Sequence, residues 1–330
     1  IMLKGKTILI TGGTGSFGNM FVPMTLEKYN PKKIIIFSRD EMKQWEMAKL
    51  YGNDERVRFF IGDVRDKERL YRALDGVDYL VHAAATKIVP TAEYNPFECI
   101  KTNIHGSENV AKAALLHRVK KCILISTDKA CKPVNVYGSS KFIAERMFTN
   151  YDYMSNETIF SSVRYGNVIA SRGSFIPLWI SMIKEEKPLM VTSLEMTRFL
   201  FTLSDAVDTV LSSVECAEGG EVFIPHISSF DMKTILITLE KYMSKTFNYG
   251  IMGLRPGEKL HEDMLAETEL PYTFIPPISG LLAVRPQYTN REHNSDWKKY
   301  KGKEFNSSLH VSNDILHLQG LIQRGLKESN

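Results

Sequence analysis

A short apolar run that leads into a glycine-rich turn is the feature that most limits how this chain can fold. Residues 7–10 read as a buried strand, and Gly12, Gly15 and Gly18 follow as a helical pattern begins. Glycines in this arrangement allow a tight turn, a close approach to a pyrophosphate and tight packing of the helix on the strand. The helix start also offers free N–H groups and a favourable dipole to phosphate. The pattern therefore predicts a dinucleotide-binding unit.

Apolar strand patterns alternate with helical patterns through the first half of the chain. Further strands are predicted at residues 33–37, 57–61, 79–83 and 122–125. This alternation is typical of a parallel sheet with helices on both faces. We therefore expect an α/β fold with two parts. A Rossmann-type doubly wound parallel sheet is predicted in residues 2–165, together with the catalytic residues, and a smaller C-terminal α/β substrate-binding lobe in residues 166–330.

The second half of the chain alternates less regularly. Helical patterns at residues 205–216 and 232–243 and a short strand pattern at residues 221–224 are assigned to the smaller lobe. Some segments of this half are expected to return to the large sheet. Beyond about residue 265 loops are predicted, with a final amphipathic helix near residues 315–322.

Composition excludes several classes of function. The 330 residues carry a net charge of +4 spread along the chain, which is too weak a basic balance to indicate a nucleic-acid partner. No apolar run reaches the length of a membrane span, and the first residues enter a strand directly, so a cytoplasmic protein without membrane contact is expected. The four cysteines lack metal-ligand spacing, and we expect reduced thiols and no metal site.

The end of the second predicted strand bears on the choice of cofactor. Ser38 and Arg39 stand where an acidic residue would reach the ribose hydroxyls of NAD, and Asp40 follows them. A hydroxyl and a guanidinium suit the additional 2′-phosphate of NADP. NADP is therefore the predicted cofactor.

The reactive side chains are predicted after the fifth strand. Thr127, Asp128 and Lys129 leave its carboxyl end, where open α/β sheets place their ligands. Tyr137 and Lys141 follow, four residues apart in a helical pattern, so both lie on one helix face. An ammonium beside the phenol is expected to lower the pKa of the tyrosine towards the range of a general base.

Three arginines in turn-rich surroundings indicate an anionic ligand. They are Arg172, Arg198 and Arg255. A guanidinium presents a fixed fork of donors, and several of them in one cleft would suit a diphosphate.

Several of these motifs together resemble a known superfamily. The glycine-rich turn, Gly62-Asp63-Val64, the Tyr137/Lys141 pair and Arg164-Tyr165-Gly166-Asn167 are similar to the extended short-chain dehydrogenase/reductases. A narrower resemblance, from about Lys6 to about Met264, is to the inverting UDP-N-acetylglucosamine 4,6-dehydratases of pseudaminic acid biosynthesis. Its motifs are Phe37-Ser38-Arg39-Asp40-Glu41, Ala92-Glu93-Tyr94-Asn95-Pro96, Ser126-Thr127-Asp128-Lys129-Ala130 and Arg255-Pro256-Gly257-Glu258-Lys259.

The resemblance implies a set of site residues. The candidate catalytic residues are Thr127, Asp128, Lys129, Tyr137 and Lys141. Cofactor contacts are expected at Gly12, Thr14, Gly15, Ser16, Phe17, Gly18, Ser38, Arg39, Asp40, Asp63, Val64, Ala83, Ala84, Ala85, Lys87, Asn103, Tyr137 and Lys141. Substrate contacts are expected at Lys87, Asn167, Arg172, Arg198, Arg255 and Glu258.

The resemblance also implies a reaction, the loss of water across carbons 5 and 6 of UDP-N-acetylglucosamine with NADP as transient oxidant. Tyr137 would take the proton of the 4-hydroxyl, Lys129 would be the base at carbon 5, and Asp128 the acid towards the 6-hydroxyl. Protonation of carbon 5 on the opposite face would give UDP-2-acetamido-2,6-dideoxy-β-L-arabino-hexos-4-ulose. Elimination needs both an acid and a base, so partial burial is expected to move the pKa values of Asp128 and Lys129 towards neutrality. A homo-oligomer, up to a hexamer, is also implied.

One departure from the family pattern lies at Thr86-Lys87-Ile88, where the related enzymes usually carry Met-Lys-His. The change leaves the proposed proton carriers intact and bears on fine specificity. Two alternatives stay open at this point. One is a retaining UDP-N-acetylglucosamine 4,6-dehydratase, which would use the same reactive residues. The other is a non-catalytic NADP-binding regulator on the same fold, against which the Tyr137/Lys141 pair argues.

Overall fold

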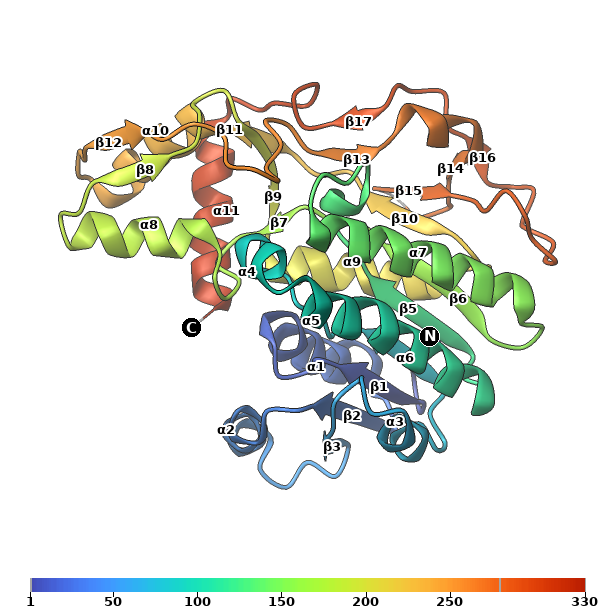
Figure 1. Cartoon of the computed structure of the whole chain (residues 1–330). Coiled ribbons are helices and arrows are strands. Elements are labelled where there is room, and N and C mark those ends of the chain that lie inside the picture. Colours follow the sequence, from blue (N-terminus) through green and yellow to red (C-terminus); the bar gives the residue numbers. More distant parts are fainter. Residues whose placement is uncertain (1, 279, 330) are drawn as a thin grey trace.

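The computed structural model describes residues 2–278 and 280–329 as a large sheet flanked by helices, with a second lobe at one side (Figure 1). Strand and helix alternate through the first half of the chain, as the sequence pattern predicts. The strands are β1 (Thr7–Thr11), β2 (Lys33–Ser38), β3 (Val57–Ile61), β4 (Tyr79–His82), β5 (Lys121–Ile125) and β6 (Ile159–Val163). The helices are α1 (Ser16–Tyr29), α2 (Glu41–Tyr51), α3 (Lys67–Ala73), α4 (Val89–Tyr94), α5 (Pro96–Ile100), α6 (Gly106–Leu116) and α7 (Val136–Met154).

The large sheet has ten strands within the described residues, in the order β16-β14-β15-β10-β6-β5-β4-β1-β2-β3. Neighbours from β3 to β10 (Val222–Pro225) all pair in parallel. The strand order reverses between β1 and β4, and such a switch point opens a ligand crevice at the carboxyl ends of the strands. The predicted α/β fold with a doubly wound parallel sheet is confirmed.

Alternating side chains of the strands supply two cores. Ile8 and Ile10 pack with residues of α1 and α9 (Leu203–Cys216), whereas Leu9 packs with residues of α3, α6 and α7. Successive strand residues point to opposite faces of a sheet. Because helices cover both faces, the central strands are apolar at nearly every position. In Figure 1, α6 and α7 cover the face nearer the viewer.

Two elements of the second half belong to the large sheet region and not to the lobe: one is a strand of the sheet, and the other is a helix that packs on it. The strand predicted at residues 221–224 forms β10, which pairs in parallel with β6. The helix predicted at residues 205–216 is α9, and its Val207 and Val210 pack in the core under the sheet. The assignment of these two elements to the lobe is therefore wrong. Apolar periodicity shows that an element has a buried face, but not which core that face joins.

The region after residue 265 holds more regular structure than predicted. β14 (Thr273–Ile275), β15 (Leu281–Val284) and β16 (Lys298–Lys299) continue the large sheet with antiparallel pairings. Strands of two to four residues are too short to show an alternation in sequence, which explains why loops were expected. The predicted final helix is confirmed and spans α11 (Ile315–Glu328).

The lobe has a core of its own, to which Trp179, Ile235 and Leu318 contribute. Elements on both sides of residue 165 share the large sheet, so a domain boundary there stays a prediction. The strands of the lobe and its flanks are β7 (Asn167–Val168), β8 (Leu189–Val191), β9 (Thr197–Phe201), β11 (Ser229–Asp231), β12 (Tyr249–Ile251), β13 (Asp263–Leu265) and β17 (Phe305–Asn306). The helices are α8 (Phe175–Lys184) and α10 (Met232–Met243), together with α11.

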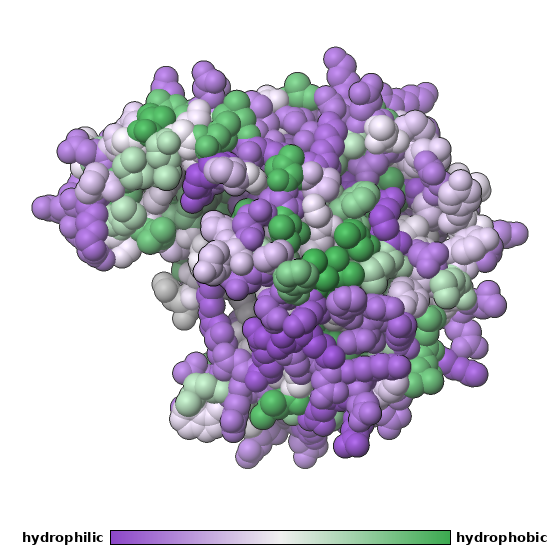
Figure 2. All heavy atoms as spheres, viewed as in Figure 1, coloured by the Kyte–Doolittle hydropathy of each residue, from purple (hydrophilic) through white to green (hydrophobic). Residues whose placement is uncertain are grey.

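The surface in Figure 2 is mostly hydrophilic, with a group of apolar residues near the centre of the view. The outline is indented where the lobe overhangs the part of the molecule formed by the first half of the chain. No helix among the described residues is both long and apolar enough to cross a membrane.

Candidate active site

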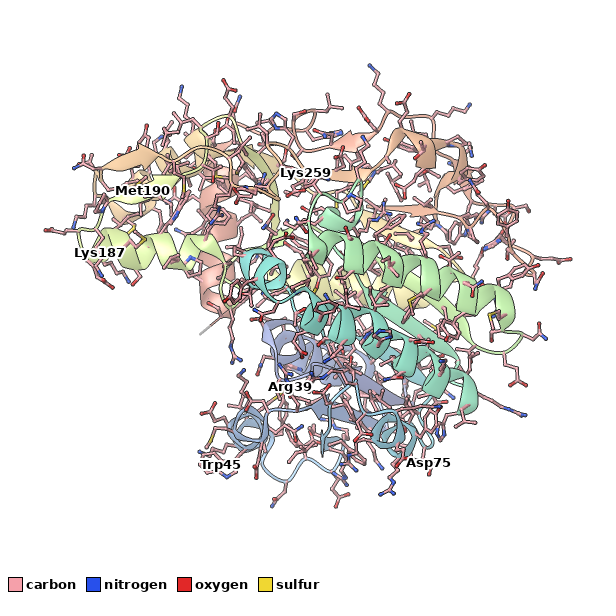
Figure 3. The ribbon with its side chains drawn as sticks, viewed as in Figure 1. Arg39, Trp45, Asp75, Lys187, Met190 and Lys259 are labelled. Atoms are coloured by element: carbon pink, nitrogen blue, oxygen red, sulfur yellow. The ribbon has the colours of Figure 1, made fainter. Side chains whose placement is uncertain are left out.

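A cavity of about 1360 Å³ lies between the carboxyl ends of the parallel strands and the lobe. It extends from Ser38 and Arg39, at the end of β2, past the end of β5 to Met190 in the lobe. Figure 3 labels three of its lining residues, Arg39 at one end and Met190 and Lys259 at the other. The cavity thus occupies the crevice at the switch point of the sheet, where this class of fold binds its ligands.

The glycine-rich turn forms one wall of the cavity. Gly12 has a φ of +66°, and a Cβ at this position would lie 2.8 Å from the backbone of Ala84. A Cβ on Gly18 would overlap the carbonyl group of Gly13, because α1 packs directly on the turn. Both positions therefore require glycine. The bare backbone between them can approach a pyrophosphate, and this wall fits a dinucleotide.

The end of β2 forms the rim of the same wall. Ser38 Oγ lies 2.7 Å from Thr14 Oγ1, which joins the rim to the glycine-rich turn. The side chain of Arg39 is 65% exposed and has one distant ionic partner, Asp63, at 3.7 Å. Asp40 caps α2 by accepting the N–H of Lys43, and this hydrogen bond lowers the pKa of its carboxyl. A weakly held guanidinium at the rim is free to meet a phosphate.

Most of the predicted cofactor residues border the cavity. Two do not: Gly18 lies beneath the turn, and Asn103 is buried with its amide bonded to Thr86 and Ser140. Asn103 therefore ties the segment after β4 to α7 and has no place on the cavity wall. The predicted residues that border it are Gly12, Thr14, Gly15, Ser16, Phe17, Ser38, Arg39, Asp40, Asp63, Val64, Ala83, Ala84, Ala85, Lys87, Tyr137 and Lys141.

Tyr137 and Lys141 lie in the first two turns of α7 and both face the cavity. Asn135 begins this helix by accepting the N–H of Gly138 at 2.7 Å, and Glu93 accepts the N–H of Val136 at 2.6 Å. These caps satisfy N–H groups that a helix start would otherwise leave free. The position of the phenol is therefore set by the helix start.

Burial sets the pKa values of this pair. It raises the pKa of Tyr137 to about 12, against the opposing charge of Lys129. It lowers the pKa of Lys141 to about 8, against the opposing charge of Glu145. The predicted lowering of the tyrosine pKa by Lys141 is therefore wrong for this structure. The loss of water around a buried phenolate raises the pKa of Tyr137 by more than the attraction of the nearest cation lowers it. The cation that acts on Tyr137 is Lys129 and not Lys141.

Lys129 lies between two carboxylates. Its Nζ is 3.0 Å from Asp128 Oδ1 and 3.4 Å from Glu262 Oε1. Burial favours loss of the lysine proton, but the charges of Asp128 and Glu262 outweigh it and raise the pKa of Lys129 above its ordinary value. The predicted shift of this pKa towards neutrality is therefore wrong for this structure. The side chain starts as an ammonium and must pass its proton on before it can act as a base.

The two carboxylates beside Lys129 differ in their access to the cavity. Asp128 is fully buried, accepts hydrogen bonds from Thr127 and Lys129, and is absent from the wall formed by the described residues. Glu262, directly before β13, is 2% exposed and borders the cavity. Each keeps one carboxylate oxygen without a hydrogen-bond partner among the described residues.

Glu262 is a site residue that the sequence patterns do not reveal. The residue follows shortly after the Arg255 to Lys259 motif, which was its nearest sequence signal. Nothing in the linear pattern connects it with Lys129, which lies far upstream. The two meet because the segment before β13 packs against the segment that follows β5, where Lys259 Nζ donates to the carbonyl of Cys131 at 2.7 Å.

Two of the three predicted arginines, Arg198 and Arg255, border the same cavity, and Arg172 is not among its described lining residues. Arg172 donates to the carbonyl of Thr14 at 3.3 Å, so it lies over the glycine-rich turn and not on the described cavity wall. Arg198 borders the cavity, but its guanidinium already donates to the carbonyls of Lys259 and Leu260. Arg198 therefore holds the segment that carries Glu262.

The remaining predicted substrate residues border the cavity. Arg255 is about half exposed and ion-paired with Glu258. Lys87 lies across from the lobe, with its Nζ 3.5 Å from Ser171 Oγ. The side-chain oxygen of Asn167 is buried with no hydrogen-bond partner among the described residues. Arg255, Lys87 and Asn167 thus have polar groups free to contact a ligand.

The parallel strand order, the glycine-rich turn, and Tyr137 and Lys141 facing one cavity define the extended short-chain dehydrogenase/reductase class. The chain belongs to the family described as polysaccharide biosynthesis protein, whose profile matches residues 8–274. The resemblance drawn from the sequence motifs is confirmed.

Three comparisons locate the chain within this family. An inverting UDP-N-acetylglucosamine 4,6-dehydratase of Campylobacter jejuni (strain 81-176) is 46% identical over 322 residues, 95% of this chain and 94% of the relative. A UDP-glucose 4-epimerase of Rickettsia bellii is 43% identical over 274 residues, 82% of this chain and 80% of the relative. The crystal structure of Pen from Bacillus thuringiensis is 35% identical and superposes with a TM-score of 0.90, covering 98% of this chain and 99% of that chain.

Proposed function

We propose that the chain catalyses the 4,6-dehydration of UDP-N-acetylglucosamine with inversion at carbon 5. The observation that carries this proposal is that Tyr137, Lys129 and Glu262 all border one cavity, with Asp128 in contact with Lys129. Oxidation at carbon 4 needs a base near the 4-hydroxyl. Loss of water needs a further base and a further acid, whereas epimerisation at a carbon that carries a hydroxyl needs neither. The identity to the Campylobacter dehydratase over nearly the whole chain supports the same assignment.

The cofactor in this proposal is a nicotinamide dinucleotide held by the glycine-rich wall. Gly12, Thr14 and Gly15 would face its pyrophosphate, and Ala84 would let it pass close to the backbone. When bound, such a cofactor takes a hydride from carbon 4 and returns it to carbon 6. We propose NADP in preference to NAD, because Arg39 presents an exposed guanidinium at the rim.

The side chains of the chain then handle the protons. Tyr137 must first lose its own proton, and as a phenolate it accepts the proton of the 4-hydroxyl; Lys141 lies one helical turn further along the same face. The ketone formed at carbon 4 acidifies the hydrogen on carbon 5, and Lys129 takes it. A carboxylic acid beside Lys129 gives its proton to the departing 6-hydroxyl, and Asp128 is the donor predicted from the sequence. Protonation of carbon 5 on the opposite face inverts that centre.

The uridine diphosphate end is proposed to lie towards the lobe. Arg255 would meet a phosphate there, because its guanidinium is half exposed on the cavity wall. Asn167 would offer its unpaired amide oxygen to a donor on the ligand. Arg172 and Arg198 are engaged with backbone carbonyls, so they would act by shaping the turn and the wall.

Proton NMR of a reaction run in deuterated water tests the proposal. Incubation of the purified protein with UDP-N-acetylglucosamine should give a 6-deoxy-4-ketose with deuterium at carbon 5 and the ring couplings of the L-arabino isomer. A D-xylo product formed first would identify a retaining dehydratase, and a product epimerised at carbon 4 with its 6-hydroxyl kept would identify an epimerase. No conversion by protein loaded with cofactor would favour a non-catalytic regulator.

We further propose a homo-oligomer, up to a hexamer, as the resemblance implies. Light scattering at micromolar concentration checks it. A monomer under those conditions would contradict this part of the proposal.

A further inference from the structure

Lys129 has two carboxylate partners, and only one of them faces the space where a substrate would lie. Asp128 has no exposed surface, and its Oδ1 accepts from both Thr127 and Lys129. Glu262 reaches Lys129 from the other side through Oε1, while its Oε2 has no hydrogen-bond partner among the described residues. A general acid must come within hydrogen-bond reach of the oxygen that it protonates. Glu262 borders the cavity, and Asp128 would have to leave its buried position to do so.

We infer that Glu262 is the acid that protonates the departing 6-hydroxyl, an inference that rests on the proposed function. The role predicted for Asp128 then changes to that of a positioning residue. Asp128 holds the ammonium of Lys129 in place at 3.0 Å and is itself held by the Thr127 hydroxyl. Glu262 would thus act on the reacting atoms, and Asp128 would hold Lys129 from behind the cavity wall.

The surroundings of Glu262 allow it to carry a proton. Burial raises its pKa and the neighbouring Asp128 charge adds to this effect, while Lys129, Arg198 and Lys259 oppose it. Arg198 Nε lies 3.8 Å from Glu262 Oε1 and is the second cation on that oxygen. The pKa remains above the ordinary value of a glutamate. A carboxyl with a raised pKa can act as an acid where an exposed glutamate has already lost its proton.

One proton transfer within the ion pair produces both groups that the elimination needs. Passage of a proton from Lys129 Nζ to Glu262, across 3.4 Å, turns an ammonium and a carboxylate into an amine and a carboxylic acid. The amine then takes the proton from carbon 5. The electron pair of the carbon 5–hydrogen bond forms the double bond between carbons 5 and 6 as the carbon–oxygen bond at carbon 6 breaks. The proton of Glu262 joins the leaving oxygen to form water.

The proton count closes over the cycle. After water loss Lys129 is again an ammonium and Glu262 again a carboxylate, so the ion pair is restored. The proton that Tyr137 takes from the 4-hydroxyl equals in number the proton that carbon 5 must regain.

The backbone at Glu262 is fixed independently of its side chain. Its N–H donates to Ser307 Oγ at 2.8 Å, and its carbonyl accepts the N–H of Ser307 at 2.8 Å. Ser307 Oγ also lies 2.6 Å from Thr197 Oγ1 in β9. An amide in place of the carboxyl therefore leaves the anchoring of this segment intact, and Glu262→Gln is a fair test of the acid.

Two isosteric substitutions separate the two assignments of the acid. Glu262→Gln should reduce formation of the 6-deoxy product from UDP-N-acetylglucosamine by about 100- to 10,000-fold, the usual contribution of a general acid. Oxidation at carbon 4, followed by the absorbance of the reduced nicotinamide, should persist. Asp128→Asn removes a carboxylate charge that lies behind the cavity wall, so it should reduce the rate of 6-deoxy product formation less than Glu262→Gln does. If Asp128→Asn stops water loss while Glu262→Gln stays near wild type, Asp128 is the acid and the inference is wrong.

A substrate with a 6-fluoro group in place of the 6-hydroxyl gives the decisive measurement. Fluoride can leave without a full proton transfer, so the defect of Glu262→Gln should shrink at least about tenfold with this substrate. Lys129→Met lacks the base and should stay inactive with both substrates. An equal defect of Glu262→Gln with both substrates would show a structural role and overturn the inference.

Two controls make each outcome interpretable. Thermal unfolding checks that the variants are folded. Should Glu262→Gln not fold, Glu262→Asp, which keeps a carboxyl, should retain 6-deoxy product and show no preference for the fluoro substrate; a strong preference would contradict the acid role. Wild-type protein must first convert UDP-N-acetylglucosamine, because its failure to do so would reject the proposed function and not the place of Glu262 within it.

Discussion

The two walls of the cavity are built in opposite ways. The glycine-rich wall comes from one continuous segment, Gly12 to Gly18, and faces the cavity largely with backbone and short side chains. At the opposite wall Lys129 and Glu262 meet from distant parts of the chain, and Asp128 lies buried behind that wall in contact with Lys129. On the proposed function, the first wall binds the cofactor through shape and N–H groups, whereas the second moves protons, so its pKa values depend on every neighbouring charge. The proposed binding residues are therefore encoded locally, and the proposed proton-transfer residues are brought together by the tertiary structure.

The largest expected effect separates two steps on the proton-handling wall. Tyr137→Phe removes the hydroxyl that accepts the proton of the 4-hydroxyl, so both oxidation and product formation should fall, by about 100- to 10,000-fold. Lys129→Met removes only the base for carbon 5. Its 6-deoxy product should fall by a similar factor, while reduced-nicotinamide absorbance still rises slowly on addition of UDP-N-acetylglucosamine. Near-normal dehydration by folded Lys129→Met would make Lys129 a structural residue and would break the contrast between the two walls.

A pH series tests whether burial sets the pKa of Lys141. Its pKa is lowered from 10.5 to about 8 in the folded protein, so between these pH values the unfolded chain binds more protons at this site. The free energy of unfolding should therefore rise with pH through this window because of Lys141, at up to about 1.4 kcal/mol per pH unit and about 3 kcal/mol in total. Lys141→Met should lack this rise. Urea unfolding of both proteins between pH 7.5 and about 10.5 measures the difference, and a constant difference would mean that the lysine is not desolvated.

An alanine at position 39 tests the claim that the glycine-rich wall binds the cofactor by shape plus one charge. Arg39→Ala should weaken the binding of NADP by about 1.5–3 kcal/mol, the usual contribution of a charged hydrogen bond. NAD, which lacks the 2′-phosphate, should bind nearly as before. Titration calorimetry with both cofactors gives the two affinities. Equal weakening of both would show that Arg39 does not contact the 2′-phosphate.

The smallest effects come from a pair of glycines, one at the proton-handling wall and one far from it. A Cβ on Gly138 would overlap the carbonyl group of Lys129, so Gly138→Ala should cost about 1–3 kcal/mol of unfolding free energy and displace the reactive strand end. Gly320 in α11 has open space around its Cβ position, and Gly320→Ala should add about 0.5–1 kcal/mol. Chemical denaturation measures both. Similar unfolding free energies for the two variants would mean that the backbone of Lys129 leaves room for a methyl group at position 138.

Much of the fold and part of the site could be predicted from the sequence. The central strands β1, β2, β4 and β5 are mostly buried and apolar, which allowed their prediction, and the helical spacing of Tyr137 and Lys141 placed them on one face. Other predictions failed for identifiable reasons. The arginine pattern could not tell that Arg172 folds back onto Thr14, and residue type could not reveal that two carboxylates raise the pKa of Lys129.

The sequence by itself determined the parallel strands, the glycine-rich wall and the strand end that carries Asp128 and Lys129, because each arises from residues within about one turn or one strand of each other. The tertiary structure alone decided that Glu262 meets Lys129, that Arg198 holds the segment carrying Glu262, and that α9 and β10 join the large sheet. These contacts join segments far apart in the chain. A local pattern shows that a side chain will be buried, but its charge partner depends on which distant segment packs against it.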